Sequence, residues 1–317
     1  MKKFIKYIFL FLVSLILLIF IISICTSLIE RKYTNFKIKS NPKYIIIGHS
    51  YPECAYNDSL IPNFKNLAQS GESYFYSYFK TKEIIKQNPS VKIIFIEFTN
   101  NQINSKMDQW IWGDKYLSHR YPKYSSFMSL SDNFLLFKNN SSGFMNSMSV
   151  STKIKLEKIM GGEIDVPVKV GGYLHLVRNK TDSIVKSLTH SKNTYSSKTE
   201  ISEKNLLYLS KLIKLCNENE KKVILVRSPL HEKYLGYDCE ETYNSIREKR
   251  YSDVEYLDFS KFPLSNDEFG DLEHINYKGA KIFSEWFTNL LKNGILENSD
   301  KQNYINNEII KIKETKL

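Results

Sequence analysis

The chain has 317 residues, of which 42% are hydrophobic and 14% aromatic, and 45 Lys and Arg residues against 34 Asp and Glu residues give a net charge of +11. This length and apolar content suit one large packed domain or two small ones. The charge is typical of a solvated lysine-rich surface or of attraction to an acidic polymer or anionic lipid. Nucleic acid is a less expected partner, because the sequence has no basic run of five residues, no zinc-ligand spacing and no aromatic RNA-binding signature.

The first segment is an uncharged stretch of nineteen residues from Tyr7 to Cys25, with three lysines before it. In a helix this stretch spans about 28 Å, close to the hydrocarbon thickness of a bilayer. It ends without the small residues of a signal-peptide cleavage site. We therefore expect residues 1–30 to be a retained transmembrane anchor, with a cleaved signal peptide as the alternative.

Basic residues flank this stretch on both sides, with four more between positions 31 and 39. A short basic leader followed by a single span usually translocates what comes after it. We expect a single-pass protein of the cell membrane whose body is periplasmic or extracellular, after a polar linker at 31–42.

The four cysteines show no metal-site spacing, and neither do the histidines, so the sequence predicts no metal site and no cofactor. They stand at Cys25, Cys54, Cys216 and Cys239. We expect free thiols, with one disulfide between Cys216 and Cys239 as the alternative.

Strand and helix patterns alternate along most of the remaining chain. Short apolar runs typical of buried strands occur at residues 43–47, 91–98, 223–226 and 254–257. Helical spacing of apolar residues occurs at residues 71–88, 202–219 and 276–293. This alternation predicts an α/β domain over 43–293, with a parallel sheet covered on both faces. In such sheets, ligands bind beyond the carboxyl ends of the strands.

Two regions depart from this alternation. Residues 102–200 are too long for a simple loop and are rich in aromatic residues such as Trp110 and Trp112. We expect an insertion there, forming either a lid or sugar-binding platform or a small core of its own. Residues 294–317 are charged and weakly periodic, which predicts a frayed helix or a polar tail.

One serine stands at the end of the first predicted strand, in the sequence Gly48-His49-Ser50. Asp271 and His274 lie three residues apart just before the last predicted helix. Acyl transfer needs a nucleophile, a base and a group that orients the base. We therefore predict a serine hydrolase or acyltransferase, with Ser50 as nucleophile, His274 as base and Asp271 as its orienting group.

The nucleophile elbow of the α/β-hydrolases is excluded. That motif requires glycine where Pro52 stands, and it follows several strands. The sequence between the apolar stretch and Ser50 is too short to hold them.

These residues resemble the SGNH (GDSL-type) hydrolases, including membrane-anchored envelope members that O-acylate polysaccharides. The Gly-His-Ser sequence resembles the first block of that family, and Asp271-Leu272-Glu273-His274 resembles the last. The resemblance covers roughly residues 43–293 and implies a three-layer α/β/α domain with a flavodoxin-like strand order.

The two middle blocks of this family supply hydrogen-bond donors for the oxyanion. Gly71, in Gln69-Ser70-Gly71-Glu72, fits the glycine of the second block. Asn100 matches the oxyanion asparagine of the third block, and Asn101 is its alternative. The resemblance thus implies an oxyanion hole formed by Gly71 and Asn100.

The sequence departs from the family at two positions, where His49 replaces the usual Asp and Phe98 replaces a glycine. His49 is expected to fill space, to bond a backbone group or to touch substrate. Glu53 is expected to border the pocket or to serve as a cap or ion-pair partner. Arg227 and His231 follow a predicted strand, so Arg227 is a candidate ligand for an anionic sugar and His231 a rival base, unless both lie on a surface loop.

Together these features predict a membrane-anchored, extracytoplasmic serine enzyme that acts on acyl esters, foremost O-acetyl groups of a surface polysaccharide. Acyl transfer and ester hydrolysis use the same residues, so the sequence predicts either reaction. The expected partners are an acylated carbohydrate or acyl donor, the membrane, and a membrane-bound acyltransferase. The alternative is a non-catalytic glycan-binding or scaffold protein with the same fold.

Overall fold

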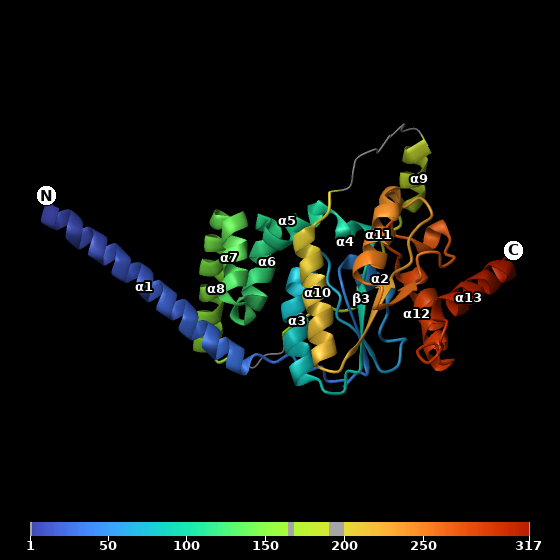
Figure 1. Ribbon diagram of the computed structural model, residues 1–317, viewed down its shortest axis with the longest axis horizontal. Coiled ribbons are helices and arrows are strands. Elements are labelled where there is room, and N and C mark those ends of the chain that lie inside the picture. Colours follow the sequence, from blue (N-terminus) through green and yellow to red (C-terminus); the bar gives the residue numbers. More distant parts are fainter. Residues whose placement is uncertain (1, 164–167, 190–199, 317) are drawn as a thin grey trace. The chain divides into compact units, whose positions relative to one another are not determined.

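The computed structural model describes residues 2–163, 168–189 and 200–316. The chain forms two compact units (Figure 1). The first unit consists of Met1–Lys37 and Ile111–Lys169, and the second of Ile38–Trp110 and Val170–Leu317. The predicted insertion at 102–200 is therefore divided between them.

The named secondary-structure elements of the first unit are all helices. Its α-helices are α1 (Lys2–Tyr33), α6 (Asp114–Tyr124), α7 (Leu130–Asn139) and α8 (Ser141–Gly161), with the 3-10 helix η2 (Ser125–Phe127) between α6 and α7. Helix α5 (Asp108–Trp112) runs across the division between the units. Helix α1 is long and apolar enough to cross a membrane, as the sequence predicts.

The second unit is built on a five-stranded parallel sheet, which confirms the predicted α/β class. The strands are β1 (Tyr44–Ile47), β2 (Phe64–Asn66), β3 (Ile93–Glu97), β4 (Lys222–Arg227) and β5 (Glu255–Asp258). Their order in the sheet is β2-β1-β3-β4-β5. The order reverses between β1 and β3, and in open α/β sheets the ligand crevice lies at such a reversal, beyond the carboxyl ends of the strands.

Helices and short 3-10 segments connect these strands. The α-helices are α2 (Ser50–Ala55), α3 (Tyr74–Gln87), α4 (Asn100–Ile103), α9 (Thr181–Thr189), α10 (Glu203–Glu218), α11 (Glu240–Arg250), α12 (Tyr277–Lys292) and α13 (Lys301–Lys316). The 3-10 helices are η1 (Ser105–Met107), η3 (Leu235–Cys239) and η4 (Asn266–Glu268).

The central strands β1, β3 and β4 are buried on both faces, which explains their mostly apolar sequences. On one face, Ile46 and Phe95 pack in a core with Phe283 and Phe287 of α12. Successive strand residues point to opposite faces, so Ile45 and its equivalents in β3 and β4 form the other face, and they are fully buried as well.

Strand β2 and helix α13 are among the elements that differ from the sequence predictions. Strand β2 was missed because only Phe64 among its three residues is strongly apolar. The segment expected as a frayed helix or tail contains the regular helix α13 over Lys301–Lys316. Ile305 and Ile309, one turn apart, are buried in the same core as α12, so this helix is part of the second unit.

Candidate active site

Ser50 is placed by a sharp turn at the carboxyl end of β1. Gly48 has φ +152°, and a Cβ there would lie 2.6 Å from Cβ of Glu97 and 2.9 Å from Cγ of Pro52. Only glycine fits this close approach between the ends of β1 and β3. Helix α2 then begins at Ser50, so the serine stands at the reversal point of the sheet.

The structure brings the three predicted catalytic residues together across 224 positions of sequence. His274 Nε2 lies 2.8 Å from Ser50 Oγ. On the other side of the ring, Nδ1 lies 2.9 Å from Oδ1 and 3.2 Å from Oδ2 of Asp271. The arrangement is that of a nucleophile, a base and its orienting group in hydrogen-bond contact.

The loop that carries Asp271 folds back on its own carboxylate. Asp271 Oδ1 accepts the backbone N–H groups of Glu273 at 2.8 Å and of His274 at 2.9 Å. Burial alone would raise the pKa of Asp271, but the hydrogen bond and charge of His274, the backbone bond from Glu273 and the charge of Arg178 lower it below its ordinary value. The carboxylate is therefore ionised at neutral pH and favours the imidazole tautomer that carries its proton on Nδ1.

Arg178 is a member of this site that the sequence did not reveal. Its guanidinium forms an ion pair with Asp271 Oδ2, and Nη2 lies 3.3 Å from Nδ1 of His274. Because Oδ1 already accepts two backbone N–H groups, Arg178 occupies the second oxygen and limits rotation of the carboxylate. Arg178 belongs to the region expected as an insertion, where no motif distinguishes it from other arginines.

Arg178 lies in residues 170–180, a segment without regular secondary structure that backbone hydrogen bonds hold in place. Its N–H groups donate to Ala68 O at 3.1 Å from Gly172, to Glu53 O at 2.8 Å from Leu174 and to Gly270 O at 2.9 Å from Lys180. Leu176 O accepts the N–H of Tyr277 at 2.9 Å. The segment therefore joins the region around α2 to the loop of Asp271 and His274.

His49, which replaces the aspartate of the resembled family, is fully buried. Its Nδ1 accepts the N–H of Tyr51 at 3.3 Å, which leaves Nε2 to donate to Thr99 Oγ1 at 3.3 Å. Thr99 in turn donates to Oδ1 of Asn101 at 2.7 Å. His49 thus links the turn after β1 to the loop after β3.

Burial, with a smaller contribution from the charge of His274, lowers the pKa of His49 to about 3. His49 is therefore neutral at physiological pH. It holds the loop of Asn101 and does not compete with His274 as a base.

Glu53 fixes the loop that contains Gly71. Its carboxylate accepts the N–H of Ser70 at 2.7 Å and also the Ser70 hydroxyl. Gly71 follows with φ +71°, a left-handed conformation that favours glycine. Glu53 therefore positions the predicted oxyanion loop, and a direct contact of Glu53 with substrate stays a prediction.

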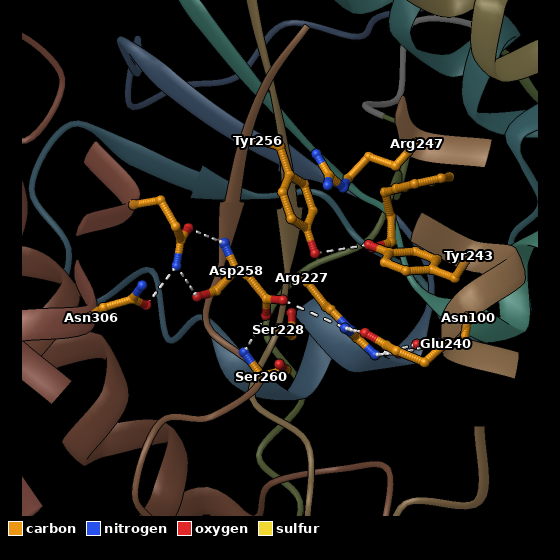
Figure 2. A network of polar contacts seen from close by, with 12 residues as sticks. Asn100, Arg227, Ser228, Glu240, Tyr243, Arg247, Tyr256, Asp258, Ser260 and Asn306 are labelled. Atoms are coloured by element: carbon orange, nitrogen blue, oxygen red, sulfur yellow. Dashed lines mark hydrogen bonds and ion pairs between the residues drawn. The ribbon is translucent and has the colours of Figure 1, made fainter. Parts of the chain in front are cut away.

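Asn100 and Arg227 lie in a separate polar network at the ends of β3, β4 and β5 (Figure 2). Asn100 Nδ2 donates to Glu240 at 2.8 Å, and Asn100 Oδ1 accepts from Arg227. The Arg227 guanidinium donates to both carboxylate oxygens of Glu240 at 2.8 Å and lies 3.4 Å from Asp258.

This network encloses Arg227, whose side chain is only 1% exposed. The rings of Tyr237 and Tyr243 lie 5.2 and 4.8 Å from the guanidinium carbon. Phe98, the other departure from the resembled family, is buried and stacks on Tyr243. This geometry favours a structural role for Arg227 and Asn100, and their substrate and oxyanion roles stay predictions.

His231, the rival base, has its ring nitrogens engaged elsewhere. Nε2 lies 2.9 Å from Asn266 Oδ1, and Nδ1 accepts the N–H of Lys233 at 3.1 Å. His274 is therefore the histidine that contacts Ser50.

Glu97, at the end of β3, is a second residue that the sequence did not single out. Its carboxyl oxygens accept the N–H of Ser228 at 2.9 Å and the Ser228 hydroxyl at 2.6 Å. Burial raises the pKa of Glu97 to about 8 despite these hydrogen bonds. A protonated Glu97 against Gly48 ties the ends of β1, β3 and β4 together.

The described residues contain no group of three or more His, Cys, Asp or Glu side chains that is placed to hold a metal ion. The four cysteines are free thiols, so the alternative disulfide between Cys216 and Cys239 is not formed.

Comparison with known proteins adds one match, to a family model whose description names no function, over residues 179–296. This part of the chain contains Asp271 and His274 but not Ser50. A search of the curated proteins finds no match. The case for a function therefore depends on the geometry of the site.

Proposed function

We propose that this protein is a membrane-anchored, extracytoplasmic serine enzyme that transfers or removes acyl groups, foremost O-acetyl groups, on a surface polysaccharide. The observation that carries the proposal is the hydrogen-bonded series from Ser50 Oγ through His274 to Asp271, with contacts of 2.8 and 2.9 Å. An SGNH-type, three-layer arrangement of the second unit is part of the proposal. It is supported by the parallel sheet and by the position of Ser50 directly after β1.

In the proposed reaction, His274 removes the proton from Ser50 as Oγ attacks the acyl carbonyl. The ionised Asp271 stabilises the imidazolium that forms and keeps the ring oriented. His274 then returns the proton to the departing alcohol oxygen, and the acyl group remains on Ser50. Water or a sugar hydroxyl resolves this ester, which gives hydrolysis in the first case and transfer in the second.

The oxyanion needs donors that are already in place when it forms. The backbone N–H of Gly71 is the first candidate, supported by the hold of Glu53 on Ser70. For the second donor, the hydrogen bonds favour Asn101 over Asn100. The Asn100 amide donates to Glu240, whereas Asn101 uses its carbonyl oxygen in the bond from Thr99 and so keeps its amide for other contacts.

Helix α1 supports the proposed location of the reaction at the membrane. A helix that is long and apolar enough to cross a membrane would hold the enzyme at the envelope, near surface glycans. Acyl groups would reach it from a membrane-bound acyltransferase or another acyl donor.

Labelling with a fluorophosphonate tests the proposal, because this reagent phosphonylates only an activated serine. The full-length protein in detergent should label, and Ser50→Ala should not. Ser59→Ala, at an exposed serine just beyond α2, is the matched control and should label like the wild type. Equal labelling of wild type and Ser50→Ala would show that Ser50 is not the nucleophile.

A non-catalytic glycan-binding or scaffold protein is the second candidate, motivated by His49 and Phe98 in place of the family residues. It predicts that the wild-type protein does not label at all while still binding glycan. If labelling succeeds, release of acetate from an acetylated glycan identifies an esterase, and appearance of acetate on an acceptor glycan identifies a transferase.

A further inference from the structure

Within the first unit, the second half of α1 is fastened to α8 by polar side chains. The contacts are Thr152 Oγ1 to Ser23 Oγ at 3.2 Å, Lys155 Nζ to Ser27 Oγ at 3.0 Å, and Lys158 Nζ to Glu30 Oε1 at 3.3 Å. Glu30 also accepts the hydroxyl of Ser126 at 2.6 Å. These bonds fix α8 and the chain before it to α1 at the level of residues 23–30.

A cavity of about 490 Å³ lies between α1 and helices α6, α7 and α8. Phe20 and Ile24 of α1 face it, as do Phe134 and Phe137 of α7. Arg31 borders it at the end of α1 that follows the apolar stretch. The cavity is thus apolar over most of its lining and basic at one end.

Helix α7 leaves a row of large apolar side chains uncovered beside this cavity. Leu130 is 90% exposed, Phe134 63% and Phe137 42%. Their spacing of four and three residues places them along one side of the helix. A contiguous apolar surface of this kind marks a contact with a membrane or with another molecule.

The position of the α7 surface relative to a bilayer can be inferred from α1, because α1 and α7 line the same cavity. Phe20 and Ile24 belong to the uncharged stretch from Tyr7 to Cys25, whose length matches the hydrocarbon layer. Arg31 lies six residues beyond Cys25, which is about 9 Å further along the helix. With α1 as the membrane span, the cavity would extend from the edge of the hydrocarbon layer to the level of the headgroups.

We propose that α7 and this cavity form a lipid-contact surface of the first unit. Acyl chains of the bilayer occupy the cavity and cover Leu130, Phe134 and Phe137, and lipid phosphates lie at the level of Arg31. A bilayer is favoured over a protein partner because α7 lines this cavity together with Phe20 and Ile24, which belong to the apolar stretch of α1. A helix that presents one apolar side at the membrane interface is a known mode of attachment. The first unit would thus contact the membrane through α7 as well as through the spanning helix α1.

Photo-crosslinking in a bilayer tests this surface. The full-length protein carrying Phe134→p-benzoylphenylalanine is placed in vesicles of phosphatidylethanolamine and phosphatidylglycerol, irradiated and examined by mass spectrometry. The matched control carries the probe at Leu207 of α10, an apolar residue of the second unit that is 45% exposed. A third protein carries it at Phe11, inside the apolar stretch, and gives the yield of full lipid contact.

The proposal predicts phospholipid adducts at position 134 with a yield near that of position 11 and at least fivefold above that of position 207. A lipid yield at position 134 no higher than at position 207 would overturn it. Adducts at position 134 with a second copy of the chain or with another protein, in place of lipid, would overturn it as well and would identify a protein interface. The result does not depend on the proposed catalytic function.

Discussion

Two polar clusters lie at the carboxyl ends of the strands, and they differ in how far their side chains are exposed to solvent. In the cluster of Ser50, the side chains of His274 and Asp271 are 13% and 19% exposed. In the cluster of Arg227, the guanidinium is 1% exposed and is paired with Glu240, Asp258 and Asn100. Both clusters thus lie at the strand ends. The first differs in having a partly exposed serine, Ser50, in hydrogen-bond contact with a histidine.

The comparison predicts opposite consequences for activity and stability. Changes in the Ser50 cluster should abolish reaction and leave the fold intact, because its residues are partly solvated and serve a reacting group. Changes in the Arg227 cluster should weaken the fold, because they leave the buried side chain of Asn100 without its hydrogen-bond partner. The following experiments are ordered from the largest expected effect to the smallest.

The largest effect is expected for Asp271→Asn. The amide would still accept the two backbone N–H groups, but it would present N–H to His274 Nδ1 and so favour the wrong tautomer. We expect the rate of fluorophosphonate labelling to fall by about 10⁴-fold. The free energy of unfolding should change by only about 1 kcal/mol. A variant that labels at the wild-type rate would remove Asp271 from the mechanism.

Arg227→Met should have the reverse profile. It fills a similar volume but removes the donor of the buried Asn100 side chain and the cation of Glu240 and Asp258, which are partly solvated. A buried polar group left without its partner costs about 1–3 kcal/mol. Urea denaturation followed by circular dichroism measures this loss. Near-wild-type stability together with lost labelling would place Arg227 in the catalytic site instead.

Arg178→Ala tests the residue that limits rotation of the Asp271 carboxylate. We expect labelling to slow by about 10-fold, in line with the loss of a charged hydrogen bond of about 1.5 kcal/mol. Guanidinium ion at tens of millimolar should restore part of the rate.

Arg250→Ala is the matched control, because Arg250 is also 38% exposed and forms an ion pair with Glu203. It should label normally. If both arginine variants slow equally, or if guanidinium rescues neither, the Arg178 assignment is contradicted.

Glu97→Gln tests the protonated carboxyl behind Gly48. The native pKa of Glu97 is about 8, above its ordinary value of 4.5, so the folded state keeps a proton that the unfolded chain has lost at neutral pH. Stability from this group is therefore present at low pH and declines as pH rises from about 5 to about 8.

The Tm of Glu97→Gln relative to wild type should consequently increase between pH 5 and pH 8. Because both proteins share all other titrating groups, a difference in Tm that does not change with pH would show that Glu97 is ionised in the native state.

The sequence predicts the parts of this molecule that depend on local pattern. Unbroken apolar runs identified four of the five strands, and the Gly-His-Ser and Asp-x-x-His motifs identified Ser50, Asp271 and His274. Strand β2 was missed because its burial depends on neighbours supplied by the rest of the fold.

The site residues that the sequence did not reveal were missed for a different reason. Arg178 lies in a segment that is held by backbone hydrogen bonds to residues distant in the sequence. No local motif indicates such bonds. The pairing of Asn100 with Arg227 and Glu240 was also hidden, since Asn100 and Glu240 are 140 positions apart. The fold class and the contact of Ser50 with His274 and Asp271 were thus predictable, whereas the residues that hold this group in place were not.

The central claim is that Ser50 is an activated nucleophile, and mapping the fluorophosphonate adduct tests it most directly. The labelled full-length protein is digested, and the modified residue is identified by tandem mass spectrometry. The account predicts a phosphonyl group on Ser50, with a labelling rate that falls when His274 is changed to Ala. An adduct on another residue, or labelling of Ser50 that does not depend on His274, would contradict it.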